Sequence, residues 1–143
     1  MAPVEPVASD QAIALRYPRR SLQRAERAFR CSPFQLDLLG DMRSHSISIR
    51  QVCSSGGVKS RYSRRPLTEL RAENEMMWLI AVGLLRREVD GQGLTDSFRL
   101  TPMGRQVFDR LFPLTPAQYR ATLGDHLYNA WGRRVRSLSW WHG

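Results

Sequence analysis

The sequence predicts a mainly α-helical chain with one small β-hairpin, and two observations lead to that fold class. Over most of the chain, apolar residues recur three and four positions apart, which is the spacing of one face of a helix. By contrast, two short runs of strand-like spacing flank the tetrapeptide Asp90-Gly91-Gln92-Gly93. Because glycine tolerates a positive φ, this tetrapeptide suits the tight turn of a hairpin.

Length and composition indicate one folded domain with extensions. The chain has 143 residues, and we expect a flexible tail at residues 1–15, a domain at residues 16–131 and a basic, aromatic tail at residues 132–143. No apolar run of about 18 residues predicts a transmembrane helix. Residues 1–10 also lack the features of a secretory signal. We therefore expect a cytoplasmic protein that does not contact a membrane.

Three helices are expected ahead of the central part of the chain. The first starts at Ser21, and the second starts at Ser32-Pro33, where serine caps the helix and proline takes its first position. The second helix ends near Arg43. A third, short helix lies within residues 46–53 and ends at the turn signal Ser54-Ser55-Gly56-Gly57.

A basic loop then leads into the longest expected helix, Leu67–Val82. Apolar residues at helical spacing should face the core, and this set comprises Leu67, Leu70, Met77, Ala81 and Leu84. The hairpin follows, with expected strands Leu84–Val89 and Thr95–Leu100 on either side of the turn.

Two further helices are expected after the hairpin. Thr101-Pro102 predicts the capped start of the first, which ends at Pro113. Thr115-Pro116 predicts the start of the last, which ends at Gly132. The apolar side of this last helix comprises Tyr119, Leu123, Leu127, Ala130 and Trp131. This side either packs on the chain's own core or forms a homodimer with a second copy, and both interpretations stay open.

The positive charge is concentrated in the first half of the chain. The net charge is +9, and residues 16–65 carry twelve basic and three acidic residues. Such a concentrated positive field attracts phosphate polymers, which favours a nucleic-acid partner. An acidic protein partner, or a compositional bias toward arginine, would give the same charge.

Motifs for enzyme chemistry are absent from the sequence. The three histidines are scattered and the two cysteines have no CxxC spacing, so no metal or redox site is expected. No dinucleotide-binding, phosphate-loop or nucleophile-elbow motif occurs. We therefore expect a protein that is not an enzyme and that holds no cofactor, metal or catalytic residue.

Residues 47–111 resemble the winged helix-turn-helix superfamily, especially bacterial regulators of the PadR and MarR kind. The resemblance is carried, in chain order, by Gly83-Leu84-Leu85, Arg86-Arg87-Glu88, Asp90-Gly91, Leu100-Thr101 and Gly104. The whole chain is also similar to a small uncharacterised cyanobacterial family, a similarity that implies no function.

The first resemblance implies a winged helix-turn-helix with extra N- and C-terminal helices. It implies Ile47–Ser54 as the first helix of the motif, Leu67–Val82 as the recognition helix and Asp90–Leu94 as the wing. It further implies binding of nucleic acid, duplex DNA above all, as a transcriptional regulator. The implied phosphate contacts come from Lys59, Arg61, Arg64 and Arg65, and the implied base-edge contacts come from Thr68 or Arg71. Tyr62, within the basic loop, is expected to stack on a base or sugar.

The alternative function is a protein-protein interaction module on the same scaffold, with no direct nucleic-acid role. The long helix carries Glu69, Glu73 and Glu75, and carboxylates repel phosphate except where one accepts a hydrogen bond from cytosine. If Glu69 and Glu73 lie on the side next to the wing, we do not expect this helix to insert into a groove of the duplex.

Overall fold

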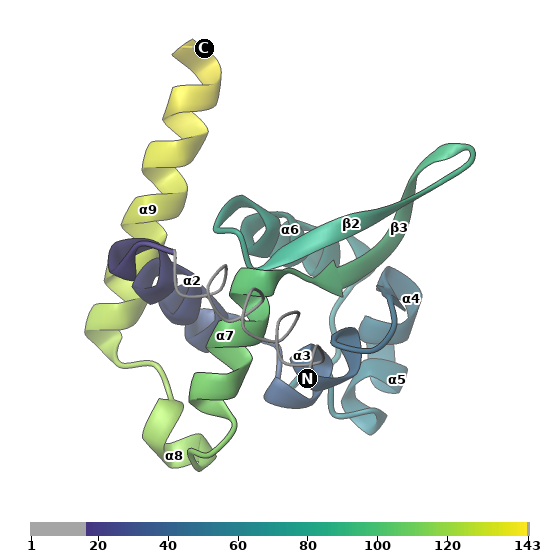
Figure 1. The fold of residues 1–143 in the computed structure, drawn as a ribbon, viewed down its shortest axis with the longest axis horizontal. Helices are drawn as coiled ribbons and strands as arrows, with labels where there is room; N and C mark the ends of the chain where they lie inside the picture. The colour runs from purple at the N-terminus through teal and green to yellow at the C-terminus, as the bar shows by residue number, and fades with distance from the viewer. Residues whose placement is uncertain (1–16, 143) are drawn as a thin grey trace, which may run out of the picture.

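The computed structural model describes the backbone of residues 17–142 and the side chains of residues 17–135 other than Pro116. The tail expected at residues 1–15 lies outside the described residues. The described chain is mainly α-helical and carries a small three-stranded antiparallel sheet (Figure 1). Within the described residues, no helix combines the length and the apolar character needed to cross a membrane.

Eight helices and three strands follow one another in the described residues. The helices are α2 (Arg19–Cys31), α3 (Leu36–Met42), α4 (Ile49–Val52), α5 (Ser54–Lys59), α6 (Glu69–Ala81), α7 (Pro102–Leu111), α8 (Pro116–Tyr119) and α9 (Leu123–His142). The strands are β1 (Ile47–Ser48), β2 (Leu85–Asp90) and β3 (Gly93–Leu100).

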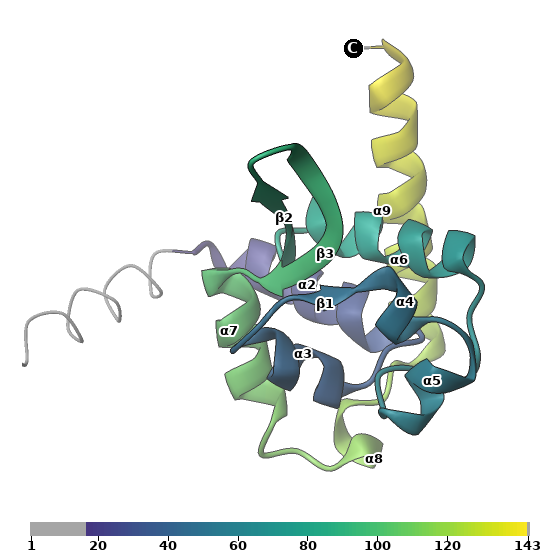
Figure 2. The same cartoon turned by 90° about the vertical axis from the view of Figure 1, so that its right-hand side faces the viewer.

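The sheet has the strand order β1-β3-β2, with β3 in the middle. The predicted hairpin is confirmed, but its strands reach closer to the tip than expected, so that only Gly91 and Gln92 lie between β2 and β3. Gly93 has a φ of +118°, a value that an L side chain rarely adopts. Strand β1, which pairs Ile47 with Phe98, lies where the sequence predicted only helix. Figure 2 shows the hairpin projecting from the body of the molecule.

The hydrophobic core lies between α2, α3, α6, α7 and the base of the sheet. Helix α2 contacts α6, α7 and α9. The largest fully buried side chains are Phe29, Phe34, Leu38, Leu39, Met42, Ile47, Met76, Leu79, Leu84, Leu85, Phe98 and Leu111. The predicted cap of α7 is confirmed, because the Thr101 hydroxyl accepts a hydrogen bond from the Gly104 amide at 2.9 Å.

The expected inward side of the long helix is confirmed only at its ends. Leu67 and Leu84 are buried, as predicted, but Leu70 and Met77 are 69% and 48% exposed. In the middle of the helix the buried residues are instead Ala72, Met76 and Leu79. The sequence of this helix contains two apolar series at helical spacing. The series Ala72, Met76 and Leu79 packs against the core, and the series that includes Leu70 and Met77 does not. The helix also starts later than predicted, at Glu69, because the Thr68 hydroxyl caps it by accepting a hydrogen bond from the Arg71 amide.

The glycine pair that was expected to stop a helix lies inside one. Gly56 and Gly57 belong to α5, which occupies half of the connection predicted to be a loop. A Cβ atom at Gly57 would overlap the carbonyl oxygen of Val52, so the absence of a side chain permits close packing of α5 on α4. The expected start of α3 at Ser32-Pro33 is also wrong, because that helix begins at Leu36 after Gln35.

The C-terminal part holds two helices where the sequence predicted one. The short α8 ends at Tyr119, and α9 starts at Leu123. Gly132 does not end α9, which continues to His142 and extends beyond the rest of the molecule (Figure 1). Gly132 faces the Trp78 ring, with its would-be Cβ position 3.9 Å from that ring, so a glycine suits a close helix crossing there.

Candidate nucleic-acid interface

The basic segment, residues 59–65, lies between α5 and the start of α6. Hydrogen bonds of its backbone fix it to the rest of the molecule. The Gln35 amide donates to the Tyr62 carbonyl at 2.9 Å, and the Arg64 amide donates to the Pro33 carbonyl at 3.0 Å. The Gln35 side chain donates a further hydrogen bond to the Ser63 carbonyl at 2.9 Å. These three hydrogen bonds hold the backbone of the segment in place.

Tyr62 does not project toward solvent, so its expected stacking on a base or sugar is wrong. Its side chain is buried, and its hydroxyl donates a 2.6 Å hydrogen bond to the Asp41 carboxylate. Burial, together with that hydrogen bond, raises the pKa of Tyr62 to about 12. Tyr62 thus anchors the basic segment to α3, while the cationic side chains on either side of it, Arg61 and Arg64, are exposed.

Four cations of the basic segment are exposed and unneutralised. The side chains of Lys59, Arg61, Arg64 and Arg65 form no ion pair and no hydrogen bond within the described residues, and all four are exposed. Arg61 has a φ of +63°, a left-handed conformation that is uncommon for a residue other than glycine. Arg64 and Arg120 line one cavity of about 410 Å³, which brings a fifth cation beside the segment.

Most arginines elsewhere are paired. Within the described residues, nine arginines form ion pairs with six carboxylates. The carboxylates are Glu26, Glu73, Glu75, Glu88, Asp109 and Asp125. Outside the basic segment, the described arginines that form no ion pair are Arg19, Arg20, Arg24, Arg50, Arg105, Arg120 and Arg134. The basic segment differs in that all four of its cations are unpaired, which leaves a local surplus that a polyanion can neutralise.

The two expected base-edge residues lie at the start of α6, next to the basic segment, but Arg71 is engaged internally. Its guanidinium group pairs at 3.3 Å with Glu75, whose side chain is only 8% exposed. Arg133 of α9 pairs with the same carboxylate at 3.2 Å. Thr68 is exposed, and its hydroxyl oxygen caps α6. Thr68 is free to donate a hydrogen bond to a ligand, and Arg71, whose side chain is 52% exposed, keeps its terminal N–H groups while its Nε pairs with Glu75.

The outward side of α6 is acidic and apolar. Leu70 and Met77 occupy its middle, and Glu69, Glu73 and Asn74 are exposed around them. Glu73 pairs with Arg87 of β2 at 3.7 Å, so this carboxylate lies beside the hairpin. The second apolar series in the sequence, Ala72-Met76-Leu79, was the signal that could have located this side correctly.

The hairpin adds little free charge. Arg86 and Arg99 both pair with Glu88, at 3.2 and 3.5 Å, and the Arg87 guanidinium lies 5.0 Å from the Phe98 ring centroid. Val89 and Leu94, which face each other across the hairpin, are 67% and 72% exposed. Near its tip the hairpin therefore presents apolar side chains.

A family model described as Npun_F0494-like matches residues 15–133. The chain belongs to the Npun_F0494-like family. This match confirms the expected similarity to a small family over residues 15–133. No curated protein and no solved structure matches the chain. The region shared with the Npun_F0494-like family includes the basic segment, α6, the hairpin and the first half of α9.

Proposed function

We propose that this chain is a winged helix-turn-helix protein that binds nucleic acid, duplex DNA in the first instance, through its phosphate backbone. The order of elements supports the fold. Helix α3, strand β1, helices α4 and α5, helix α6 and the β2–β3 hairpin follow in winged-helix order, and β1 pairs with the second hairpin strand as that topology requires. In this assignment α6 is the recognition helix, and Gly91 and Gln92 form the wing tip.

The observation that carries the proposal is the group of four unneutralised cations on the basic segment. Lys59, Arg61, Arg64 and Arg65 project from a backbone held by three hydrogen bonds to Pro33 and Gln35. Cations that contact a phosphate backbone release its counterions, and because the backbone of the basic segment is already held, binding would order only the cationic side chains. This group of cations lies immediately before α6, where a winged helix approaches its duplex.

The outward side of α6 shapes the kind of binding we propose. Glu69 and Glu73 would face phosphates if α6 entered the major groove, and Leu70 and Met77 offer few hydrogen bonds to base edges. We therefore propose backbone contact with little reading of sequence. A role as a transcriptional regulator would then need Thr68, or a second protein, to supply the sequence preference.

The experiment is a fluorescence-anisotropy titration of a labelled 20-base-pair random duplex at several salt concentrations from about 50 to 200 mM. We expect binding whose logarithmic affinity falls linearly with the logarithm of salt concentration. The variant Arg64→Ala/Arg65→Ala should lower the slope by about two units, since each lost phosphate contact contributes about 0.9.

The matched control is Arg19→Ala/Arg20→Ala, which removes the same charge from the exposed start of α2, far from α5 in both views (Figures 1 and 2). This control should keep the wild-type slope within about half a unit. Absence of binding at about 100 mM salt would overturn the proposal, as would equal slope changes in the two double variants.

A second candidate function is the protein-interaction module, favoured by the exposure of Leu70 and Met77. If random duplex does not bind, and a defined protein co-purifies with the wild type but not with Leu70→Glu, this second function replaces the first. Leu70→Glu should not disturb folding, because Leu70 is 69% exposed.

A further inference from the structure

Helix α9 docks on the rest of the chain through its polar side. The Asp125 carboxylate accepts a hydrogen bond from Arg30 at 3.0 Å, and the Asn129 side chain accepts one from the Trp78 indole at 2.9 Å. One turn further along, Arg133 pairs with the buried Glu75 at 3.2 Å. These contacts fix α9 against α2 and α6.

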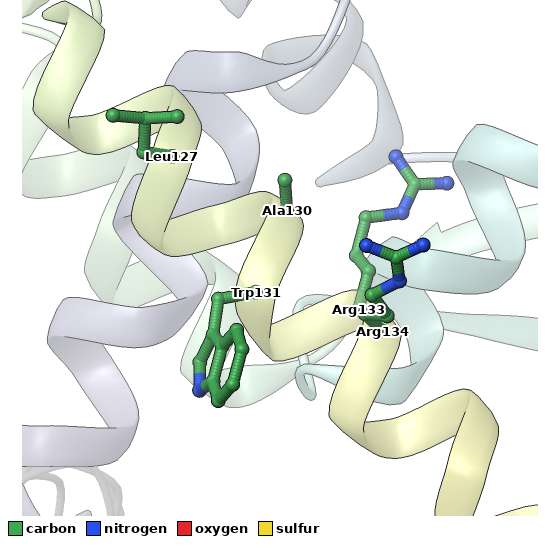
Figure 3. Close-up of a pocket in the computed structure, with 5 residues that line it drawn as sticks. All are labelled: Leu127, Ala130, Trp131, Arg133 and Arg134. Carbon is green, nitrogen blue, oxygen red and sulfur yellow. The ribbon is translucent and has the colours of Figure 1, made fainter.

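The apolar side of α9 is largely exposed, although one edge of it lines a groove of about 620 Å³ beside α2. It comprises Leu123, Leu127, Tyr128, Trp131 and Val135, which we name the α9 stripe and which are 76%, 64%, 63%, 68% and 46% exposed. Figure 3 shows Leu127, Ala130 and Trp131 projecting from the helix, with Arg133 and Arg134 on the following turn. These five residues line a hollow of about 550 Å³ to which no other element contributes. A surface helix ordinarily turns its apolar side inward, so α9 is inverted.

We propose that the α9 stripe is covered by the α9 stripe of a second copy of this chain. The stripe spans twelve residue steps, or about 18 Å of helix. Covering it would remove on the order of 600 Å² of accessible surface from each copy, given that each aromatic side chain buries about 150–250 Å². That area approaches the roughly 800 Å² per partner of a stable interface. One continuous stripe can meet its own copy about a two-fold axis.

The charges around the α9 stripe fit an antiparallel pair. Asp125, the one carboxylate on α9, is turned inward to Arg27 and Arg30. A parallel pair would oppose Arg134 to itself. An antiparallel pair centred on Trp131 instead sets Arg134 level with the partner's Tyr128, because both lie three residues from the centre. A guanidinium group over a tyrosine ring is favourable, and Arg27 already lies 4.1 Å from the Tyr128 ring centroid within one chain.

The test is the mass of the full-length protein by sedimentation equilibrium between about 1 and 100 μM, at a salt concentration high enough to suppress non-specific charge effects. We expect twice the chain mass for the wild type and a single chain mass for Leu127→Glu and for Trp131→Glu. Both positions are more than 60% exposed, so both variants should fold and keep the wild-type circular dichroism.

The matched control is Leu94→Glu at the hairpin, where the leucine is 72% exposed. This control should remain a dimer. A monomeric wild type at 100 μM would overturn the proposal, and so would a dimer that persists in both stripe variants. A stripe that instead holds a different co-purified protein, with the wild-type chain present as a single copy, would also overturn it.

Discussion

Helices α7 and α9 are both amphipathic surface helices, yet they face the core with opposite sides. Helix α7 buries Val107, Phe108 and Leu111 and leaves its polar residues in solvent. Helix α9 is bound to the body by Asp125, Asn129 and Arg133 and leaves its apolar residues in solvent. The comparison shows that an apolar series at helical spacing does not by itself identify the side of a helix that packs against the core.

The largest effect expected from this contrast is on stability. Leu111→Ala, at a leucine that is 1% exposed, should lower the free energy of unfolding by about 2–5 kcal/mol, because it leaves a cavity in the core. Leu123→Ala, at a leucine that is 76% exposed, should change it by no more than about 0.5 kcal/mol. Both substitutions are made in a Trp131→Glu background, in which we expect the protein to be monomeric, and the free energy of unfolding is measured by urea denaturation. Equal losses would show that α9 is stabilised as α7 is.

How much of this arrangement could be predicted depended on how local the signal was. The cap at Thr101 and the hairpin turn at Gly91 follow from short-range chemistry, and both were predicted correctly. The side of α6 that faces the core was not, because two apolar series compete in the sequence and only tertiary packing selects one. The buried position of Gly57 likewise depends on its contact with the end of α4, and the spacing of residues in the sequence does not predict that contact.

The candidate site was predicted in part for the same reason. The sequence indicates a surplus of cations between residues 59 and 65, and the structure leaves Lys59, Arg61, Arg64 and Arg65 exposed and unpaired. It could not indicate that Arg71 pairs with Glu75 or that Tyr62 is held by Asp41, since the partners of these contacts are fixed by the fold. Composition therefore located the cations, while the fold decided which of them stay free.

A smaller effect is expected from the polar contacts that hold α9. Arg133 pairs with the buried Glu75 and lies 5.6 Å from the Trp78 ring centroid, whereas the neighbouring Arg134 makes no ion pair with a described residue. Arg133→Ala should cost about 1–2 kcal/mol, since Glu75 keeps Arg71 as a partner. Arg134→Ala should stay within about 0.5 kcal/mol of the wild type. Equal effects of these adjacent substitutions would show that α9 is not docked by its polar side.

The smallest effect expected is a pH dependence at the start of α9. The Thr122 amide donates to the Asp125 carboxylate at 3.0 Å, and this hydrogen bond, opposed by burial and aided by Arg30, holds the pKa of Asp125 below its usual value. Because the folded-state pKa is the lower one, this contribution is fully present above about pH 4 and is lost as the pH falls through the folded-state pKa. Urea unfolding at pH 6 and at pH 3 should therefore show a smaller acid-induced loss for Asp125→Asn than for the wild type. If the variant loses as much as the wild type, Asp125 does not couple the docking of α9 to pH, and the polar anchor consists of Asn129 and Arg133 alone.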